Sequence, residues 1–186
     1  MLATRPSGAQ SRDITYDSLV RSIWAPIDPG GGTRELLRAA TLAANSHNTQ
    51  PWQFSVSDRL ITIRPDLARR CPAVDPDDHH LFASLGCAAE NIVHAAAAMG
   101  LKAEPIVVSA NEGRIDIALD PALVSSSRLA AAISERQCTR AAYDGRPVPT
   151  DHLRFIETAG QMQDVHCLLL TDAAKMGAVL DYVIQG

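Results

Sequence analysis

The chain has 186 residues, 46% of them hydrophobic, which is enough to bury one sizeable core. Its formal net charge is −4 at pH 7, and no block of Lys and Arg stands out. Because binding to nucleic acid or to an anionic membrane surface needs such a block, we expect neither partner. No stretch reaches the length of a membrane span, and Met1 to Asp13 lack the apolar segment of a secretory signal. A soluble, cytoplasmic protein is expected.

Cysteine and histidine spacing argues against a metal site. Four cysteines lie far apart with no C-x-x-C pair among them: Cys71, Cys87, Cys138 and Cys167. His79 and His80 are neighbours on a predicted helix and cannot both face one ligand, whereas Glu90 and His94 at i,i+4 spacing favour an ion pair. We therefore expect no bound metal and a reducing compartment, with Cys87 as a small apolar filler on a buried helix face.

The first predicted elements are short. Residues 1–32 contain Gly30-Gly31-Gly32 and scattered prolines, which predicts an arm with one helix over 16–24. Thr33 is placed as the N-cap of a helix that continues to about residue 44. Two alternating segments, 52–56 and 60–64, flank Ser57-Asp58 and predict a hairpin.

The clearest element is a helix from Pro76 to Met99. Asp75 is placed as its N-cap, Pro76 as its first residue and Gly100 as its C-terminal glycine. Apolar residues recur at helical spacing among many small ones: Leu81, Leu85, Ala88, Ile92 and Met99. The pattern predicts a central helix that is buried nearly all round.

The elements after the central helix mix strands and helices. A second hairpin is predicted over 105–110 and 114–119, followed by helices over 127–137 and from Thr150, a strand over 165–170 and a helix capped by Asp172. The last helix is still apolar at Leu180, Val183 and Ile184 when the chain stops, so we expect a sequence that is cut short. The absence of strict βαβ alternation favours an α+β fold.

Two segments carry candidate chemistry. The first is a polar loop between a helix and a strand, where amides can offer both a donor and an acceptor to a planar heterocycle; its candidate ligands are Asn45, Ser46, His47, Asn48 and Gln50. The second has two Arg around a thiol and a hydroxyl and could hold a phosphate monoester; it contains Arg136, Cys138, Thr139 and Arg140. From the residues alone, a capped turn and a solvated helix end explain these segments about as well.

Both segments resemble motifs of the nitroreductase family. Asn48, Gln50, Pro51 and Trp52 match its N-x-Q-P-W loop, and residues 79–104 resemble its central helix, with 72–80 closest to the Acg-like group. Residues 136–149 are similar to the R-R-S-x-R and P-V-P segment that binds the flavin phosphate, with Cys138 where the family has Ser. The resemblance covers residues 33–172.

The resemblance implies an FMN-binding α+β fold in which a central helix packs on an antiparallel or mixed sheet with helices around it. The motif order is the reverse of the family's, which indicates a duplication. Residues 33–134 are expected to be a first nitroreductase-like copy and 135–186 the truncated start of a second, part of a fused pseudo-dimer. We expect the pseudo-dimer to be completed either by formation of a homo-oligomer or by a missing C-terminal half.

The function implied is an FMN-dependent oxidoreductase. NADH or NADPH would reduce the flavin, which would pass electrons to a small-molecule acceptor such as a nitroaromatic or quinone. The alternative is a non-catalytic flavin-binding or flavin-sequestering stress protein with an occluded pocket. No catalytic residue can be assigned from the sequence.

Overall fold

The computed structural model describes residues 15–108, 113–123, 128–162 and 165–185. It divides into two compact units, residues 1–137 and 138–186. Each unit is described by itself. The predicted arm and the two predicted copies remain predictions.

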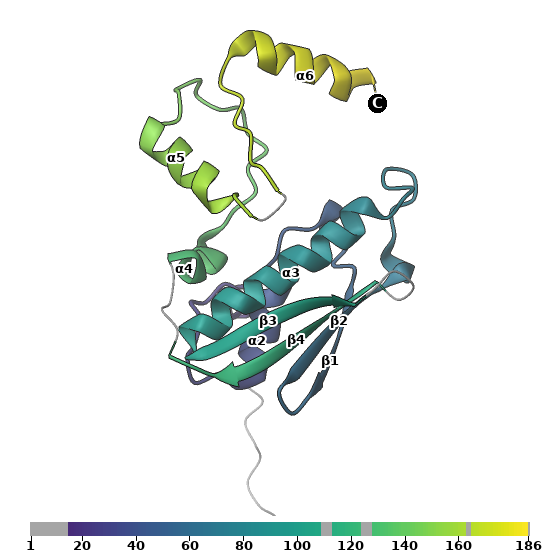
Figure 1. The fold of residues 1–186 in the computed structure, drawn as a ribbon, viewed down its shortest axis with the longest axis vertical. Coiled ribbons are helices and arrows are strands. Elements are labelled where there is room, and N and C mark those ends of the chain that lie inside the picture. The colour runs from purple at the N-terminus through teal and green to yellow at the C-terminus, as the bar shows by residue number, and fades with distance from the viewer. Residues whose placement is uncertain (1–14, 109–112, 124–127, 163–164, 186) are drawn as a thin grey trace, which may run out of the picture. The chain divides into compact units, whose positions relative to one another are not determined.

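Unit 1 is built around a four-stranded antiparallel sheet with the order β1-β2-β4-β3 (Figure 1). Strand β1, Trp52–Ser57, and strand β2, Leu60–Pro65, form a hairpin whose turn holds Asp58 at a φ of 33°. Strand β3, Leu101–Val108, pairs with β4, Arg114–Pro121, which also pairs with β2. The α+β fold and both hairpins are confirmed. β3 begins four residues before the prediction, and predicted strand residues 109 and 110 lie outside the described part.

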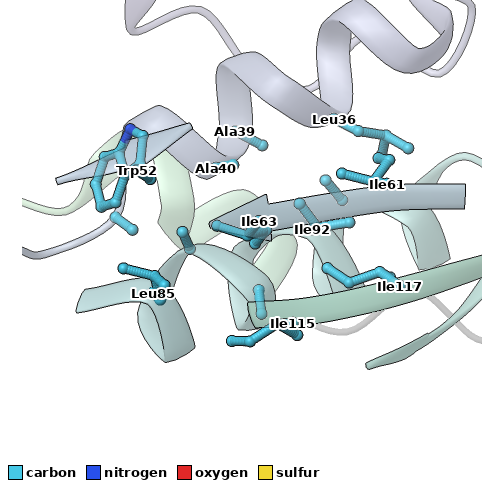
Figure 2. Close-up of a cluster of buried hydrophobic side chains, with 14 of the residues drawn as sticks. Leu36, Ala39, Ala40, Trp52, Ile61, Ile63, Leu85, Ile92, Ile115 and Ile117 are labelled. Carbon is cyan, nitrogen blue, oxygen red and sulfur yellow. The ribbon is translucent and has the colours of Figure 1, made fainter. Parts of the chain in front are cut away.

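The core forms between this sheet and two helices. Helix α3, His79–Ala98, lies against β2, β3 and β4, and α2, Gly32–Thr41, packs on α3. Because strand side chains alternate between faces, isoleucines two apart on β2 and β4 point to the same side. Figure 2 shows them meeting the two helices, and the fully buried large side chains of the cluster include Leu36, Ile61, Ile63, Leu85, Ile92 and Ile117.

Helix α3 begins three residues later than predicted. Its N-cap residue is Asp78, held in the left-handed region at φ 57°, and the predicted first residue, Pro76, lies in a turn before it. Asp75 still caps the helix, because its buried carboxylate accepts from the backbone N–H groups of His80 and Leu81, both at 3.0 Å. At the other end, Gly100 has the predicted left-handed conformation with a φ of 72°.

The prediction that α3 is buried nearly all round is wrong. One face packs in the core, whereas Phe82, Gly86 and Cys87 are exposed, so Cys87 is not the apolar filler that the sequence predicted. Small side chains raise the hydropathy of the helix without requiring burial. For the same reason α3 is, among the described residues, long and apolar enough to cross a membrane, contrary to the sequence prediction, although its packing is that of a core helix. Glu90 and His94 meet as predicted, with Oε1 and Nε2 3.0 Å apart.

The first two helices flank a Pro- and Gly-containing link. Helix α1, Tyr16–Ile23, is capped by Thr15 as a short arm helix. Helix α2 begins at Gly32 with Gly31 as N-cap, so the prediction of Thr33 as N-cap is wrong. No side chain caps α2 at its N-cap residue; instead, the Glu35 carboxylate accepts from the backbone N–H of Asp28 at 2.8 Å and ties the link to the helix.

The remaining helices are partly as predicted. In unit 1, α4 spans Arg128–Glu135 and ends two residues before the prediction, while residue 127 lies outside the described part. Unit 2 contains α5, Thr150–Ala159, and α6, Ala173–Gln185, whose first turn is capped by Asp172 as predicted. The predicted strand over 165–170 is wrong: its one described strand contact is an isolated bridge between Met162 and Val165. An extended segment needs a continuous partner to form a strand, and that bridge does not extend into one.

The start of α3 yields a test. Burial raises the pKa of Asp75, but hydrogen bonds from the N–H groups of His80 and Leu81 outweigh this, and the pKa lies below its usual value. A lowered folded-state pKa stabilises the fold above the unfolded pKa, and this contribution is lost as the pH falls through the folded pKa. We expect Asp75→Asn to lower the thermal unfolding midpoint at pH 7, with a smaller difference from the wild type below pH ~4.

Differential scanning calorimetry across this pH range measures the effect. Asp77→Asn is the matched control, because Asp77 is an exposed carboxylate two residues away with no hydrogen bond among the described residues. Equal effects of the two substitutions would contradict the assignment of Asp75 as the cap.

Candidate functional site

The polar loop that the sequence singled out joins α2 to β1 and has an unusual backbone. The loop contains a 3-10 turn, Ser46–Asn48. Another 3-10 turn, Leu67–Arg69, lies outside this loop, after β2. His47, Asn48 and Gln50 have φ values of 52°, 55° and 49°, in the left-handed region. This region costs free energy for residues other than glycine, least for Asn, and persists only where the surroundings fix it. Three such residues lie within four positions, so contacts around the loop must hold its backbone.

Hydrogen bonds within the loop fix this backbone. The Asn45 side chain spans the turn: Oδ1 accepts from the N–H of Gln50 at 2.9 Å and Nδ2 donates to the carbonyl of Ala43 at 3.1 Å. The N–H of Ser46 donates to the buried Ser84 hydroxyl of α3 at 3.4 Å, which ties the loop to the core helix. Asn45 therefore supports the loop from within.

The loop borders a pocket of about 370 Å³ that lies entirely within unit 1. The volume is within the range of small-molecule sites. The lining combines apolar, amide and cationic side chains: Ile23, Trp24, Arg38, Thr41, Leu42, Ala43, Asn48, Gln50 and Arg136. They come from the end of α1, the C-terminal half of α2, the polar loop and the residue after α4.

Arg136 reaches the pocket from far along the chain. Its Nη2 donates to the carbonyl oxygen of Leu42, 94 residues away, at 2.9 Å. Leu42 is the C-cap of α2, where unpaired carbonyls carry partial negative charge that favours a cation. This contact places a residue of the second sequence motif beside Asn48 and Gln50 of the first.

The other cation of the pocket is neutralised. The Arg38 Nε donates to Glu35 Oε2 at 2.9 Å, and its Nη2 pairs with Oε1 of the same carboxylate. The hydrogen bond from Arg38 lowers the pKa of Glu35 more than burial raises it, so this carboxylate stays ionised.

The structure separates the predicted ligands into groups. Asn48, Gln50 and Arg136 line the pocket, whereas Asn45, Ser46 and His47 do not. The three residues after the unit boundary, Cys138, Thr139 and Arg140, are exposed in unit 2, and residues 136–140 are not helical.

The remaining wall of the pocket was not predicted from the sequence, and it includes Ile23, Trp24 and Arg38. An available signal was Trp24, an aromatic residue in a segment that otherwise has the composition of an arm.

Comparison with known proteins agrees with the motifs. Two curated relatives from Mycobacterium tuberculosis, strains CDC 1551 / Oshkosh and ATCC 25618 / H37Rv, are named as proposed NAD(P)H nitroreductases. Each is 31% identical over 162 residues, which cover 81% of this chain and 46% of the relative. The chain is similar to nitroreductases. It spans about half the length of the curated relatives it matches, and no family model matches it.

The loop geometry makes a prediction about Asn45. We expect Asn45→Ala to lower the free energy of unfolding by about 1 kcal/mol, because a hydrogen bond to the Gln50 N–H is lost. Amide exchange of Gln50, followed by NMR, should become faster. Asn45→Asp keeps the acceptor oxygen and should preserve the protection of this amide. The same exchange rate in all three proteins would show that Asn45 does not hold the loop.

Proposed function

We propose that the pocket binds FMN and that the protein is an FMN-dependent NAD(P)H oxidoreductase. The observation that carries the proposal is the meeting of Asn48, Gln50 and Arg136 at one pocket, since these residues come from two motifs that resemble flavin-binding segments. The names of the two relatives support an NAD(P)H-dependent reduction.

The residues present fit the chemistry of FMN. Guanidinium groups bind phosphate monoesters through charge-assisted hydrogen bonds, and Arg136 lies at the pocket wall. A flavin ring presents both hydrogen-bond donors and acceptors along its polar edge, and the amides of Asn48 and Gln50 match either type. Neither amide makes a side-chain hydrogen bond within the described residues. Ile23, Leu42 and Ala43 add apolar surface for the remainder of the ring.

The residues of the chain would bind and orient the cofactor. Bound flavin supplies hydride acceptance from NADH or NADPH and electron transfer to an acceptor such as a nitroaromatic or quinone. Asn48 and Gln50 would fix the ring through a loop that needs no rearrangement, because Asn45 and Ser84 already hold its backbone. Arg136 would hold the phosphate end.

A non-catalytic flavin-binding protein is the second candidate. The observation that favours it is the wall that α1 adds to the pocket through Ile23 and Trp24, since cover of this kind also restricts an acceptor. The two functions share one ligand and differ in whether NADPH reduces it.

The assignment of Arg136 predicts ligand discrimination. Arg136→Ala should weaken FMN binding by about 10- to 100-fold, equivalent to ~1.5–3 kcal/mol for a hydrogen bond to a charged group, and should affect riboflavin far less. Arg128→Ala, at an exposed position of α4, is the matched control. Titration followed by flavin fluorescence gives both affinities, and an equal loss for the two ligands would contradict a phosphate contact. Arg140→Ala and the double variant show whether the second Arg contributes.

The ring contact is tested at Asn48. Because its φ is 55°, glycine removes the amide without adding backbone strain. Asn48→Gly should weaken FMN and riboflavin equally or shift the flavin reduction potential. His47→Gly changes a residue of similar φ, 52°, that does not line the pocket. It should leave the flavin affinities and the reduction potential unchanged. Identical results for the two glycine variants would place Asn48 outside the site.

Catalysis is separated from sequestration by anaerobic NADPH addition to the chain extended as in its relatives. An enzyme should show the visible absorbance of bound flavin and lose it on reduction, with NADPH consumption that continues when an electron acceptor is added. Bound flavin that NADPH leaves oxidised would favour the sequestering protein.

A further inference from the structure

Helix α1 has the properties of a helix that is held by something other than its own packing. Its eight residues, Tyr16–Ile23, bury no side chain, although its pattern is strongly amphipathic. An isolated helix of this length is not stable in water. Yet its last residue and the residue after it, Ile23 and Trp24, line the pocket. The contacts that keep α1 there therefore bear on the site.

Arg38 provides these contacts. Its guanidinium donates to the backbone carbonyl oxygens of Ile23 and Pro26, at 2.5 and 3.2 Å, on either side of Trp24. A cation at the last carbonyls of a helix is favourable in both hydrogen bonding and charge. Glu35 orients the same guanidinium and also accepts from the N–H of Asp28. We call Arg38, Glu35 and these backbone groups the Arg38 clasp.

Trp24 is the one aromatic side chain among the lining residues. It is 39% exposed, whereas the other tryptophan, Trp52, is 8% exposed in the core. The hydrogen bonds to the carbonyls of Ile23 and Pro26 restrict the backbone on both sides of Trp24, which lowers the conformational entropy lost when a ligand binds beside it. A flat, partly exposed, positioned aromatic surface suits a planar heteroaromatic ligand.

We propose that Trp24 is a ligand-contacting residue that forms the aromatic wall of the pocket, and that the Arg38 clasp is the positioning element that holds it. The inference rests on the proposed function in taking FMN as the ligand. Arg38 itself is occupied by Glu35 and two carbonyls, so its proposed role is to position Trp24 and not to bind the ligand.

The chain allows Trp24 to be observed directly. It has two tryptophans, so Trp52→Phe leaves Trp24 as the sole indole fluorophore. FMN titration into this variant should quench the Trp24 emission with the same midpoint that flavin fluorescence reports. Riboflavin should quench it as well, because the contact is to the ring.

Affinity measurements in the wild-type background supply a test that does not depend on the reporter. Trp24→Ala should weaken FMN and riboflavin alike by about tenfold, the loss expected for one aromatic stack, while Trp24→Phe keeps most of the affinity. Tyr16→Ala is the control, since Tyr16 is a 79% exposed aromatic residue of α1 that does not line the pocket.

The clasp is tested by Arg38→Gln in the reporter protein. Releasing the two carbonyls should lower the fluorescence anisotropy of Trp24 and weaken its quenching by FMN. Arg34 is an exposed arginine of α2 whose side chain makes no hydrogen bond among the described residues, so Arg34→Gln should change neither. Unchanged anisotropy in Arg38→Gln would overturn the positioning role.

The outcomes separate the two proposals. If the wild-type chain and the chain extended as in its relatives both bind no FMN, the proposed function and this inference fail together. If FMN binds but Trp24 emission is unchanged and Trp24→Ala binds as tightly, the inference alone is overturned. Tighter binding by Trp24→Ala would also overturn it, because α1 would then obstruct the pocket instead of completing it.

Discussion

The packing of α2 across α3 is the constraint on which the pocket depends. The Asn91 side chain of α3 donates to the carbonyl of Ala39 in α2 at 2.9 Å, beside alanines that let the two helices approach closely. This contact holds the C-terminal end of α2 in place against α3. The end of α2 in turn places the polar loop, the Leu42 carbonyl that Arg136 binds, and Arg38 with its hold on α1. Three walls of one pocket thus follow from the position of one helix end.

Local chemistry made much of unit 1 predictable. Apolar and polar residues alternate along β1 and from Ile61 to Arg64 of β2, on either side of a short turn, and α3 has an apolar period and a terminal glycine. The existence of these elements therefore follows from neighbours in the chain. The helix starts were less predictable. Asp75 accepts from N–H groups five and six residues ahead, whereas an N-cap side chain normally binds the N–H two or three residues ahead. The start of α3 was therefore predicted too early.

The site was predictable only in part, because its assembly depends on distant contacts. The residue types of the two motifs identified Asn48, Gln50 and Arg136, but nothing local indicates that Arg136 binds a carbonyl 94 residues earlier. The role of Asn45 as an internal brace also requires the folded loop, since an amide can bind a ligand or the backbone equally well. Trp24 was not predicted as a site residue because it lies in a segment with the composition of an arm.

Unit 2 differs from unit 1 in a way that bears on the cooperativity of the chain. None of its described residues is buried, and its helices leave Phe155, Leu180 and Val183 exposed, whereas β2, β4 and α3 share a continuous core. Regions with few buried contacts open at a lower free energy than the core to which they are joined. Backbone amides of α5 and α6 should therefore exchange through subglobal opening, while those of β2 and α3 report the global unfolding. A single unfolding free energy then describes unit 1 and not the whole chain.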